Sequence, residues 1–224
     1  MPVRAPRTQQ QRRDETRRAL LDAAVESLIQ VGFARTTTLE VQRRADVSRG
    51  ALLHHFPSKA ELLVAAVDHL AEMRARELKL LSAQLPPGKS RERTDAVLGL
   101  LWQCFSGTFF QVAMELRTAA RTDPELRPVL AAAELTLRER ILAQARTLFG
   151  KDVAEHPGLE RALDLTLQLM IGAAMSAVLH TSDKSGEGQS SVSARRLDVL
   201  IEDWKALFPA VLAHAAKPET QKRR

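Results

Sequence analysis

The chain has 224 residues, 45% of them hydrophobic and 27% charged, and its formal net charge is +6. A hydrophobic fraction of this size can bury a core, which excludes a chain disordered along its whole length. The single cysteine, Cys104, excludes a disulfide framework and a cysteine-rich zinc site. The longest run of small or apolar residues, 169–179, is too short to cross a membrane, and the basic N-terminus has no apolar stretch after it. We therefore expect a soluble cytoplasmic protein with no membrane partner.

The positive charge is concentrated at the two ends of the chain. Residues 1–60 carry eleven Lys or Arg and six acidic residues, a net charge of +5, and residues 217–224 add +3. The segment between them is nearly neutral. Basic ends are typical of proteins that bind a polyanion such as nucleic acid, although such a tail can also be merely solvated.

The first predicted elements are helices, because apolar residues recur at spacings of three and four and almost no stretch alternates with period two. Helices are predicted over residues 16–32, 37–45 and 49–56, and capping boxes at Thr37 and Ser58 start the second helix and a long fourth one. Residues 85–90, with two prolines and a glycine, form a linker.

The chain beyond the linker is also predicted to be helical. A flexible loop rich in Ser and Gly is expected at 182–193, and Pro209 should kink or split the last helix. The expected fold class is thus all-α with about nine helices. The later ones are predicted over 91–106, 108–121, 123–149, 157–181 and 194–216.

Two of the short N-terminal helices are joined by a tight turn, Asp46-Val47-Ser48, which describes a helix-turn-helix. In such a unit the second helix of the pair lies in the major groove of DNA and its side chains reach the base edges. The run TTLEVQRRADVSRGALLHHFPSK, residues 37–59, closely resembles the DNA-binding signature of the TetR family of bacterial transcriptional regulators. The resemblance extends over about residues 16–70.

The resemblance implies how the chain is divided. It predicts a disordered basic arm at 1–15, a three-helix DNA-binding domain at 16–60, a larger helical domain at 61–216 for effector binding and dimerisation, and a basic tail at 217–224. Gln42, Asp46 and Leu53 depart from the family pattern, which has Ala, Gly and often Tyr there. Asp tolerates a left-handed backbone, so the turn should survive. Leu53 cannot donate a hydrogen bond, so a phosphate contact is expected to be lost or supplied by His54.

The recognition helix contains the residues expected to touch DNA. Arg49 can reach either a guanine or a phosphate, and Gly50 and Ala51 are small enough to let the helix sit deep in the groove. His54 and His55 can donate to phosphate or base, whereas His55 can instead pack against the first helix. Arg43 and Arg44 face either DNA or solvent, and Thr38 and Lys59 lie at helix N-termini, where phosphates bind. The predicted DNA-binding residues are Thr38, Arg43, Arg44, Ser48, Arg49, Gly50, Ala51, Leu53, His54, His55 and Lys59.

The second domain contains a cluster of aromatic and Met residues and two very apolar helices. The cluster can line an effector pocket for a largely hydrophobic compound or be plain core. The two helices can bury against each other or against a second copy of the chain. The predicted pocket residues are Trp102, Phe105, Phe109, Phe110, Met114 and Met170, and the predicted dimer-interface residues are Leu163, Met170, Ala174, Ala177, Leu197, Ile201, Trp204 and Phe208.

These features predict a homodimeric, ligand-responsive transcriptional regulator. The resemblance favours a repressor that binds a palindromic operator in double-stranded DNA and is released by a small-molecule effector. The alternative is a DNA-binding protein without an effector, either a constitutive repressor or an architectural factor. No catalytic motif, metal-ligand spacing or cofactor-binding glycine pattern is present, so no enzyme activity, metal or cofactor is expected.

Overall fold

The computed structural model describes residues 8–87, 91–105, 107–178 and 187–216. Every regular element in these ranges is a helix, with ten α-helices and one short 3-10 helix, so the prediction of an all-α fold is confirmed. The α-helix beyond the expected nine is α8 (Lys151–Ala154), whose four residues are too few to produce a periodic pattern. No single helix of the described ranges is long and apolar enough to cross a membrane. Within these ranges, one bent pair of helices, Arg91–Phe105 with Phe109–Ala120, has the length and composition of a broken membrane span.

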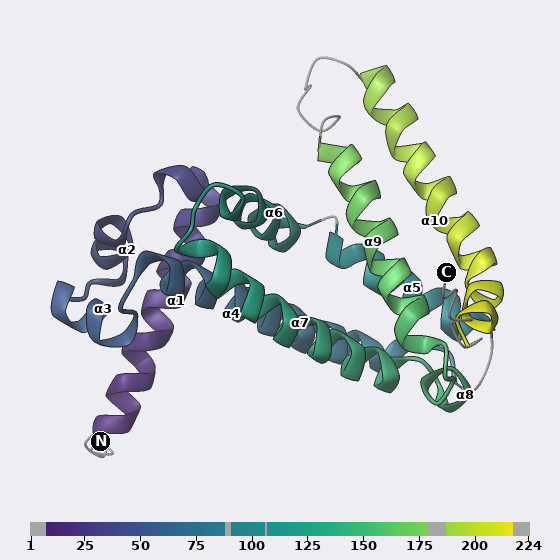
Figure 1. Cartoon of the computed structure of the whole chain (residues 1–224), viewed down its shortest axis with the longest axis horizontal. Coiled ribbons are helices and arrows are strands. Elements are labelled where there is room, and N and C mark those ends of the chain that lie inside the picture. The colour runs from purple at the N-terminus through teal and green to yellow at the C-terminus, as the bar shows by residue number, and fades with distance from the viewer. Residues whose placement is uncertain (1–7, 88–90, 106, 179–186, 217–224) are drawn as a thin grey trace, which may run out of the picture. The chain divides into compact units, whose positions relative to one another are not determined.

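The chain folds into two compact units, Met1–Arg76 with Thr108–Leu137, and Glu77–Gly107 with Arg138–Arg224. Two helices contribute to both units, namely α4 (Lys59–Leu81) and α7 (Leu126–Leu148) (Figure 1). The first unit also contains α1 (Gln9–Arg35), α2 (Thr38–Ala45), α3 (Arg49–His55) and α6 (Thr108–Ala120). The second also contains the 3-10 turn η1 (Ser82–Gln84), α5 (Arg91–Phe105), α8, α9 (Leu159–Val178) and α10 (Glu187–Ala215).

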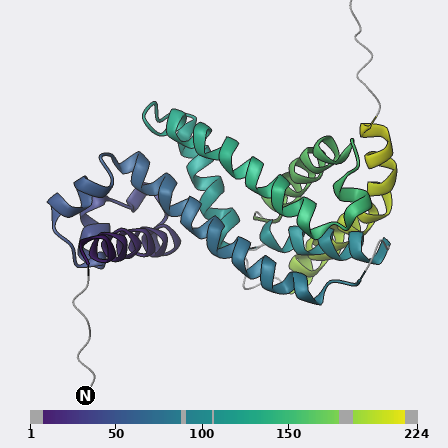
Figure 2. The same ribbon diagram turned by 90° about the horizontal axis from the view of Figure 1, so that it is seen from below.

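The core of the first unit is built on the middle of α1. Leu20, Ala24 and Leu28 recur at four-residue spacing, and each is almost completely buried. Val41 of α2 and Leu52 of α3 are buried in the same cluster, so each short helix has its own apolar anchor. Burying a leucine is worth about 2 kcal/mol, so these contacts position the two short helices more strongly than their intrinsic propensity does. Figure 2 shows α1 nearly end-on, with α2 and α3 beside it.

Two helix boundaries differ from the sequence expectation. α1 begins at Gln9 rather than Thr16, so residues 9–15 of the expected disordered arm are helical, while residues 1–7 lie outside the described part. These exposed turns have no apolar stripe that could have revealed them. α10 begins at Glu187, within the segment expected to be a loop, and continues as one helix through Pro209. The remainder of that loop, to residue 186, is outside the described residues, as is the predicted tail 217–224.

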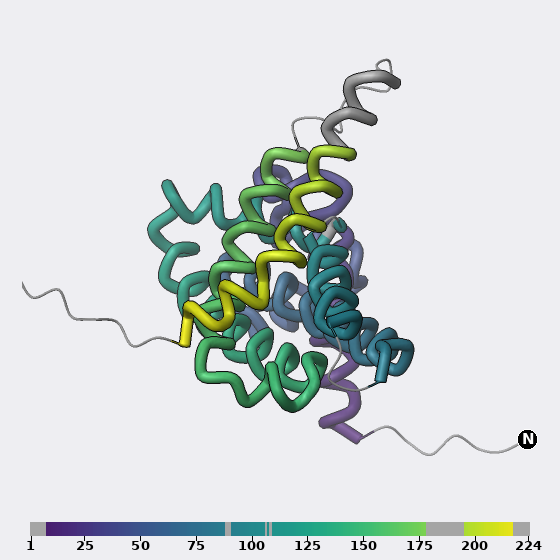
Figure 3. Tube along the Cα trace, turned by 90° about the vertical axis from the view of Figure 1, so that its right-hand side faces the viewer, coloured from purple at the N-terminus to yellow at the C-terminus, as the bar shows by residue number. Residues whose placement is uncertain are grey.

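The second unit is held together by α9 and α10, which run side by side (Figures 1 and 3). Phe149 and Phe208 stack with their ring centroids 5.6 Å apart, and both are fully buried. The indole N–H of Trp204 donates to the buried hydroxyl of Thr166 at 3.3 Å, which satisfies two polar groups inside the core. Gly158, just before α9, lies so close to α10 that a Cβ would collide with the Leu212 carbonyl oxygen.

Candidate nucleic-acid interface

The turn between α2 and α3 is set by local hydrogen bonds. The Thr37 hydroxyl accepts from the Glu40 N–H at 3.2 Å at the start of α2. Asp46, which ends α2, adopts a left-handed backbone with φ 52° and ψ 48°. The Val47 N–H donates to the Gln42 carbonyl at 3.2 Å, and the Ser48 hydroxyl accepts from the Ala51 N–H at 3.2 Å. The expectation that Asp46 preserves the left-handed turn is therefore confirmed.

One face of α3 is buried and the other is open. Leu52 is 2% exposed and anchors the helix, whereas Arg49, Gly50 and His54 are all exposed. Leu53 is also on the open face, with 45% of its surface accessible. The first turn of the helix thus exposes the guanidinium of Arg49 beside Gly50, which has no side chain. This arrangement suits a helix that contacts base edges in the major groove.

His55 lies at the C-terminal end of α3 and is half-buried. Its ring meets the His54 ring edge-on at a centroid distance of 5.5 Å, and the Phe56 ring is 6.3 Å away. Burial lowers the pKa of His55 below 6.5, and the positive charges of His54, Arg13 and Arg17 lower it further. Partial burial favours the interpretation in which this side chain packs within the first unit.

The arginines of α2 have different surroundings. The side chain of Arg43 is 74% exposed, and its Nη1 lies 3.6 Å from a carboxylate oxygen of Glu40. Arg44 is only 20% exposed, and its Nε donates to the other Glu40 oxygen at 2.7 Å. Its Nη1 donates to the Gln30 amide oxygen of α1 at 2.8 Å and is 3.5 Å from Glu26. Arg44 therefore ties α2 to α1, a role that the sequence pattern did not reveal.

The remaining predicted contact residues flank the helix-turn-helix. Thr38 is half-buried at the first turn of α2, and Ser48 is exposed. Lys59, the first residue of α4, places its ammonium 4.9 Å from the centroid of the Phe33 ring. This distance is typical of a cation–π contact, which holds the side chain of Lys59 at the end of α1.

Glu115 of α6 is the residue of this unit that sequence reasoning missed most clearly. One of its carboxylate oxygens accepts a hydrogen bond from the Phe33 N–H at 2.7 Å. Phe33 follows Gly32, whose backbone adopts φ 76° and ψ 173° and interrupts the helical conformation of α1. The two partners are 82 positions apart in the sequence, so no local pattern connects them. The bond fastens α6 to the end of α1 that leads directly into α2.

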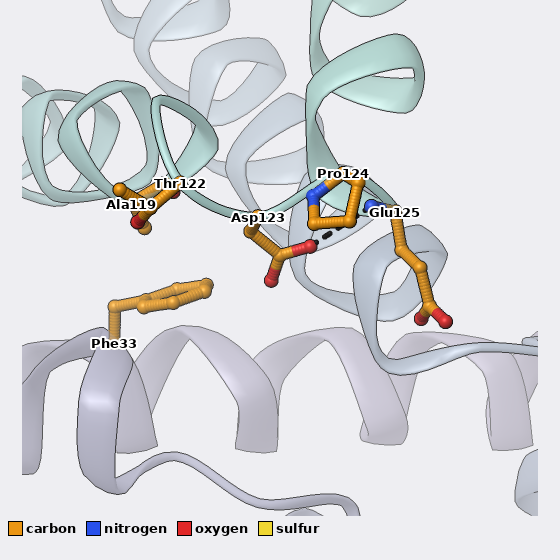
Figure 4. Close-up of a pocket in the computed structure, with 6 residues that line it drawn as sticks. All are labelled: Phe33, Ala119, Thr122, Asp123, Pro124 and Glu125. Atoms are coloured by element: carbon orange, nitrogen blue, oxygen red, sulfur yellow. Dashed lines mark hydrogen bonds between the residues drawn. The ribbon is translucent and has the colours of Figure 1, made fainter.

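An open hollow of about 500 Å³ lies beside this joint, lined by residues of α1, of the last turn of α6 and of the loop between α6 and α7 (Figure 4). The carboxylate of Asp123 caps α7, since its Oδ1 accepts from the Glu125 and Leu126 N–H groups at 3.0 and 2.9 Å. None of the predicted pocket residues lines it. Its lining residues are Phe33, Ala119, Thr122, Asp123, Pro124 and Glu125.

The predicted pocket residues are distributed over both units. Trp102, Phe105 and Met170 belong to the second unit, where Met170 is fully buried and the two aromatic rings pack against the same core. Phe109, Phe110 and Met114 belong to the first unit. Phe110 is only 4% exposed, and Phe109 packs against the first core. Of these residues, Trp102, Phe105, Phe109, Phe110 and Met170 are buried in the core of their own unit or pack against it, and Met114 is half-buried.

Most of the predicted dimer-interface residues face the interior of the second unit. The two helices bury this stripe against each other, which is the first of the two arrangements that the sequence left open. Ala177 and Leu197 are partly exposed. At most 9% of the surface of the other six is accessible, namely Leu163, Met170, Ala174, Ile201, Trp204 and Phe208.

Outside their shared core, α9 and α10 expose large apolar side chains. On α9 these are Leu165 and Met175, which are 54% and 44% exposed. On α10, Leu200 and Leu207 are 39% and 56% exposed and lie seven residues apart, about two turns along the same side of the helix. We call these four residues the outer face of the second unit. Within the described part of the chain, no group of three or more His, Cys, Asp or Glu side chains is placed to hold a metal ion.

Comparison with known proteins gives consistent matches. The model of the family described as "Bacterial regulatory proteins, tetR family" matches residues 20–66, which span α2, the turn and α3. The HTH-type transcriptional regulator Rv2912c of Mycobacterium tuberculosis is 34% identical over 146 residues, 65% of this chain and 74% of that protein. The HTH-type transcriptional regulator CymR of Pseudomonas putida is 36% identical over 121 residues, 54% of this chain and 59% of CymR. Among solved structures, multidrug binding protein EbrR complexed with ethidium has a TM-score of 0.53 at 26% identity, over 81% of this chain and 97% of EbrR.

Proposed function

Because the chain belongs to the TetR family of bacterial regulatory proteins, and is thus a helix-turn-helix transcriptional regulator and not an enzyme, we propose that it acts as an effector-controlled repressor. In this proposal a homodimer binds a palindromic operator, and a small, largely hydrophobic effector releases it. The observation that carries the proposal is the open face of α3, anchored from behind by Leu52.

The open face of α3 determines which groups can meet DNA. Arg49 can donate two parallel hydrogen bonds to guanine or one or two to a phosphate, and Gly50 lets the backbone approach the groove floor. Leu53 offers only apolar contact, for example to a thymine methyl group. His54, the residue after Leu53, is exposed and can donate a hydrogen bond to a phosphate in its place.

The outer face of the second unit supports the homodimer. Its exposed apolar side chains on neighbouring helices are what a helix-rich interface between two copies requires. A two-fold symmetric dimer presents two α3 helices, which matches the symmetry of a palindromic operator. The dimer surface is thus proposed on Leu165, Met175, Leu200 and Leu207 and not on the buried stripe.

The effector part of the proposal is supported by the EbrR complex, which contains ethidium. An effector releases DNA only to the extent that it binds the DNA-free conformation more tightly, and such coupling is typically about 1 to 3 kcal/mol. The aromatic residues Trp102 and Phe105 are only half-buried and offer ring surface to an apolar ligand.

The function is tested on a duplex that the wild-type protein selects from a randomised library. Arg49→Ala should cost about 1 to 3 kcal/mol on the selected duplex and much less on a duplex of scrambled sequence if Arg49 reads a base. Equal losses on both would assign Arg49 to a phosphate. Protection of DNA without any sequence preference would refute the proposal in favour of an architectural factor.

The effector is sought by thermal shift against a panel of hydrophobic compounds. A compound that raises the melting temperature should also weaken binding to the selected duplex, and the duplex should weaken its binding by the same factor. Tight binding of a compound without any change in DNA affinity would exclude it as the effector. Absence of any such compound would favour a constitutive repressor.

A further inference from the structure

The N-terminal part of α1 extends beyond the core to which the helix belongs. Leu20 is its first buried residue, so eleven helical residues, Gln9–Ala19, precede the core and span about 16 Å. The Thr8 hydroxyl accepts from the Gln11 N–H at 3.2 Å, and the Gln11 side chain accepts from the Thr8 N–H at 2.9 Å. This reciprocal cap closes the start of the helix. The extension is an ordered, exposed helical segment.

The extension is rich in arginine, and helical spacing sorts its charges by face. Arg13 and Arg17 are four residues apart on the side that continues the buried stripe of α1 toward its N-terminus. We call this pair the basic face of α1. Arg12 and Arg18 each lie about 120° around the helix from it, on opposite sides.

The basic face of α1 adjoins the C-terminal end of α3. The guanidinium carbon of Arg17 is 5.5 Å from the centroid of the Phe56 ring, and Phe56 directly follows α3. The charges of Arg13 and Arg17 also reach His55, since both contribute to the lowered pKa of that residue, while Asp14 acts in the opposite direction. Both observations place the two arginines beside the last turn of α3.

We propose that the basic face of α1 binds the DNA phosphates that flank the base pairs read by α3; this inference rests on the proposed function. When the N-terminal residues of α3 point into the major groove, its C-terminal end comes out at the edge of the groove, where a phosphate strand runs. Arginines held beside that end by a rigid helix meet the strand without losing the entropy of an unstructured arm. They therefore add affinity that does not depend on sequence.

The test compares two double variants that remove the same charge from different faces. Arg13→Gln with Arg17→Gln removes the basic face, and Arg12→Gln with Arg18→Gln is the matched control. Affinity for the duplex selected by the wild-type protein is measured by fluorescence anisotropy over a range of salt concentrations. The slope of the logarithm of the binding constant against the logarithm of the salt concentration is called the salt slope. Losing two phosphate contacts should reduce its magnitude by about 1.8, which corresponds to about 60-fold weaker binding at 0.1 M salt if affinity at 1 M is unchanged. Arg13→Lys with Arg17→Lys should restore most of the slope.

The outcomes separate this inference from the proposed function. A large loss in the first double variant, a small one in the control and helical circular dichroism unchanged in both would support it. Equal losses in the two double variants would overturn it, because diffuse charge would then suffice. An unchanged slope in the first variant would also overturn it while leaving the repressor intact. If the wild-type protein selects no duplex, the proposed function itself fails, and with it this inference.

Discussion

Gly32 and Glu115 form the joint between α6 and the helix-turn-helix, and the structure predicts the loss of stability when a side chain is added at Gly32. The backbone of Gly32, at φ 76° and ψ 173°, lies in a region that residues with a side chain rarely adopt. Gly32→Ala should therefore lose about 1 to 3 kcal/mol from backbone strain alone. A second penalty arises because the new Cβ would lie 3.1 Å from the Glu115 Oε2 atom.

A double-mutant cycle separates the two penalties. Glu115→Ala removes the hydrogen bond to the Phe33 N–H, and because the pair is exposed the loss should be about 1 kcal/mol or less. In the variant that lacks the carboxylate, Gly32→Ala should cost only the backbone strain. The double variant should thus be more stable than the sum of the single losses predicts, by about 0.5 to 1 kcal/mol.

The free energies of unfolding are measured by guanidinium denaturation at fixed protein concentration, followed by circular dichroism at 222 nm. Both tryptophans, Trp102 and Trp204, belong to the second unit, so their fluorescence shows whether the two units unfold together. Strict additivity of the two losses would mean that the carboxylate does not touch Gly32. A loss below about 0.5 kcal/mol for Gly32→Ala would refute the assigned backbone conformation.

Three further predictions concern α3 and the outer face. Gly50→Ala should stabilise the free protein by up to about 1 kcal/mol, since the nearest atom to a Cβ is the Ser48 Oγ at 4.0 Å. The same variant should weaken operator binding in titration, and unchanged binding would place α3 away from the groove floor. Leu207→Asp should shift sedimentation toward the monomer with helicity retained, whereas the control Leu135→Asp, whose wild-type side chain is 68% exposed, should not. Since the pKa of His55 is lowered on folding, the unfolded chain binds more protons below pH 6.5, so the stability that this residue contributes is lost as pH falls below 6.5. NMR titration should find the pKa below 6.5 and raised by Arg17→Gln, and a value at or above 6.5 would contradict the burial.

The helix-turn-helix could be predicted because each of its signals is local. The predicted cap at Thr37 acts over three residues, as does the cap that the structure has at Ser48. The left-handed Asp46 ends α2 by bonds that span three to five positions. A short window of the sequence is therefore enough to detect such signals. The resemblance to a known family then added the role of the exposed residues, which spacing alone does not provide.

Periodicity identifies a buried stripe but not the surface that covers it. The sequence predicted Ile201 and Phe208 as dimer-interface residues, and in the structure α9 of the same chain packs against their face of α10. The exposed Leu200 and Leu207 stand beside them in the sequence and give the same hydrophobic signal. Only the fold distinguishes the two sets. The bond between Glu115 and Phe33 was invisible for a related reason, because it joins residues brought together by tertiary packing.

The structure also changes how the charge of the N-terminal segment should be counted. The net charge of +5 over residues 1–60 treats every basic side chain as equally able to meet phosphate. Arg44, however, is 20% exposed and bonded to Glu40 and Gln30, so a phosphate could recruit it only by breaking contacts that tie α2 to α1. The salt dependence of DNA binding should therefore be lower than the number of basic residues suggests, and its largest contributions should come from exposed arginines such as Arg49 and Arg17.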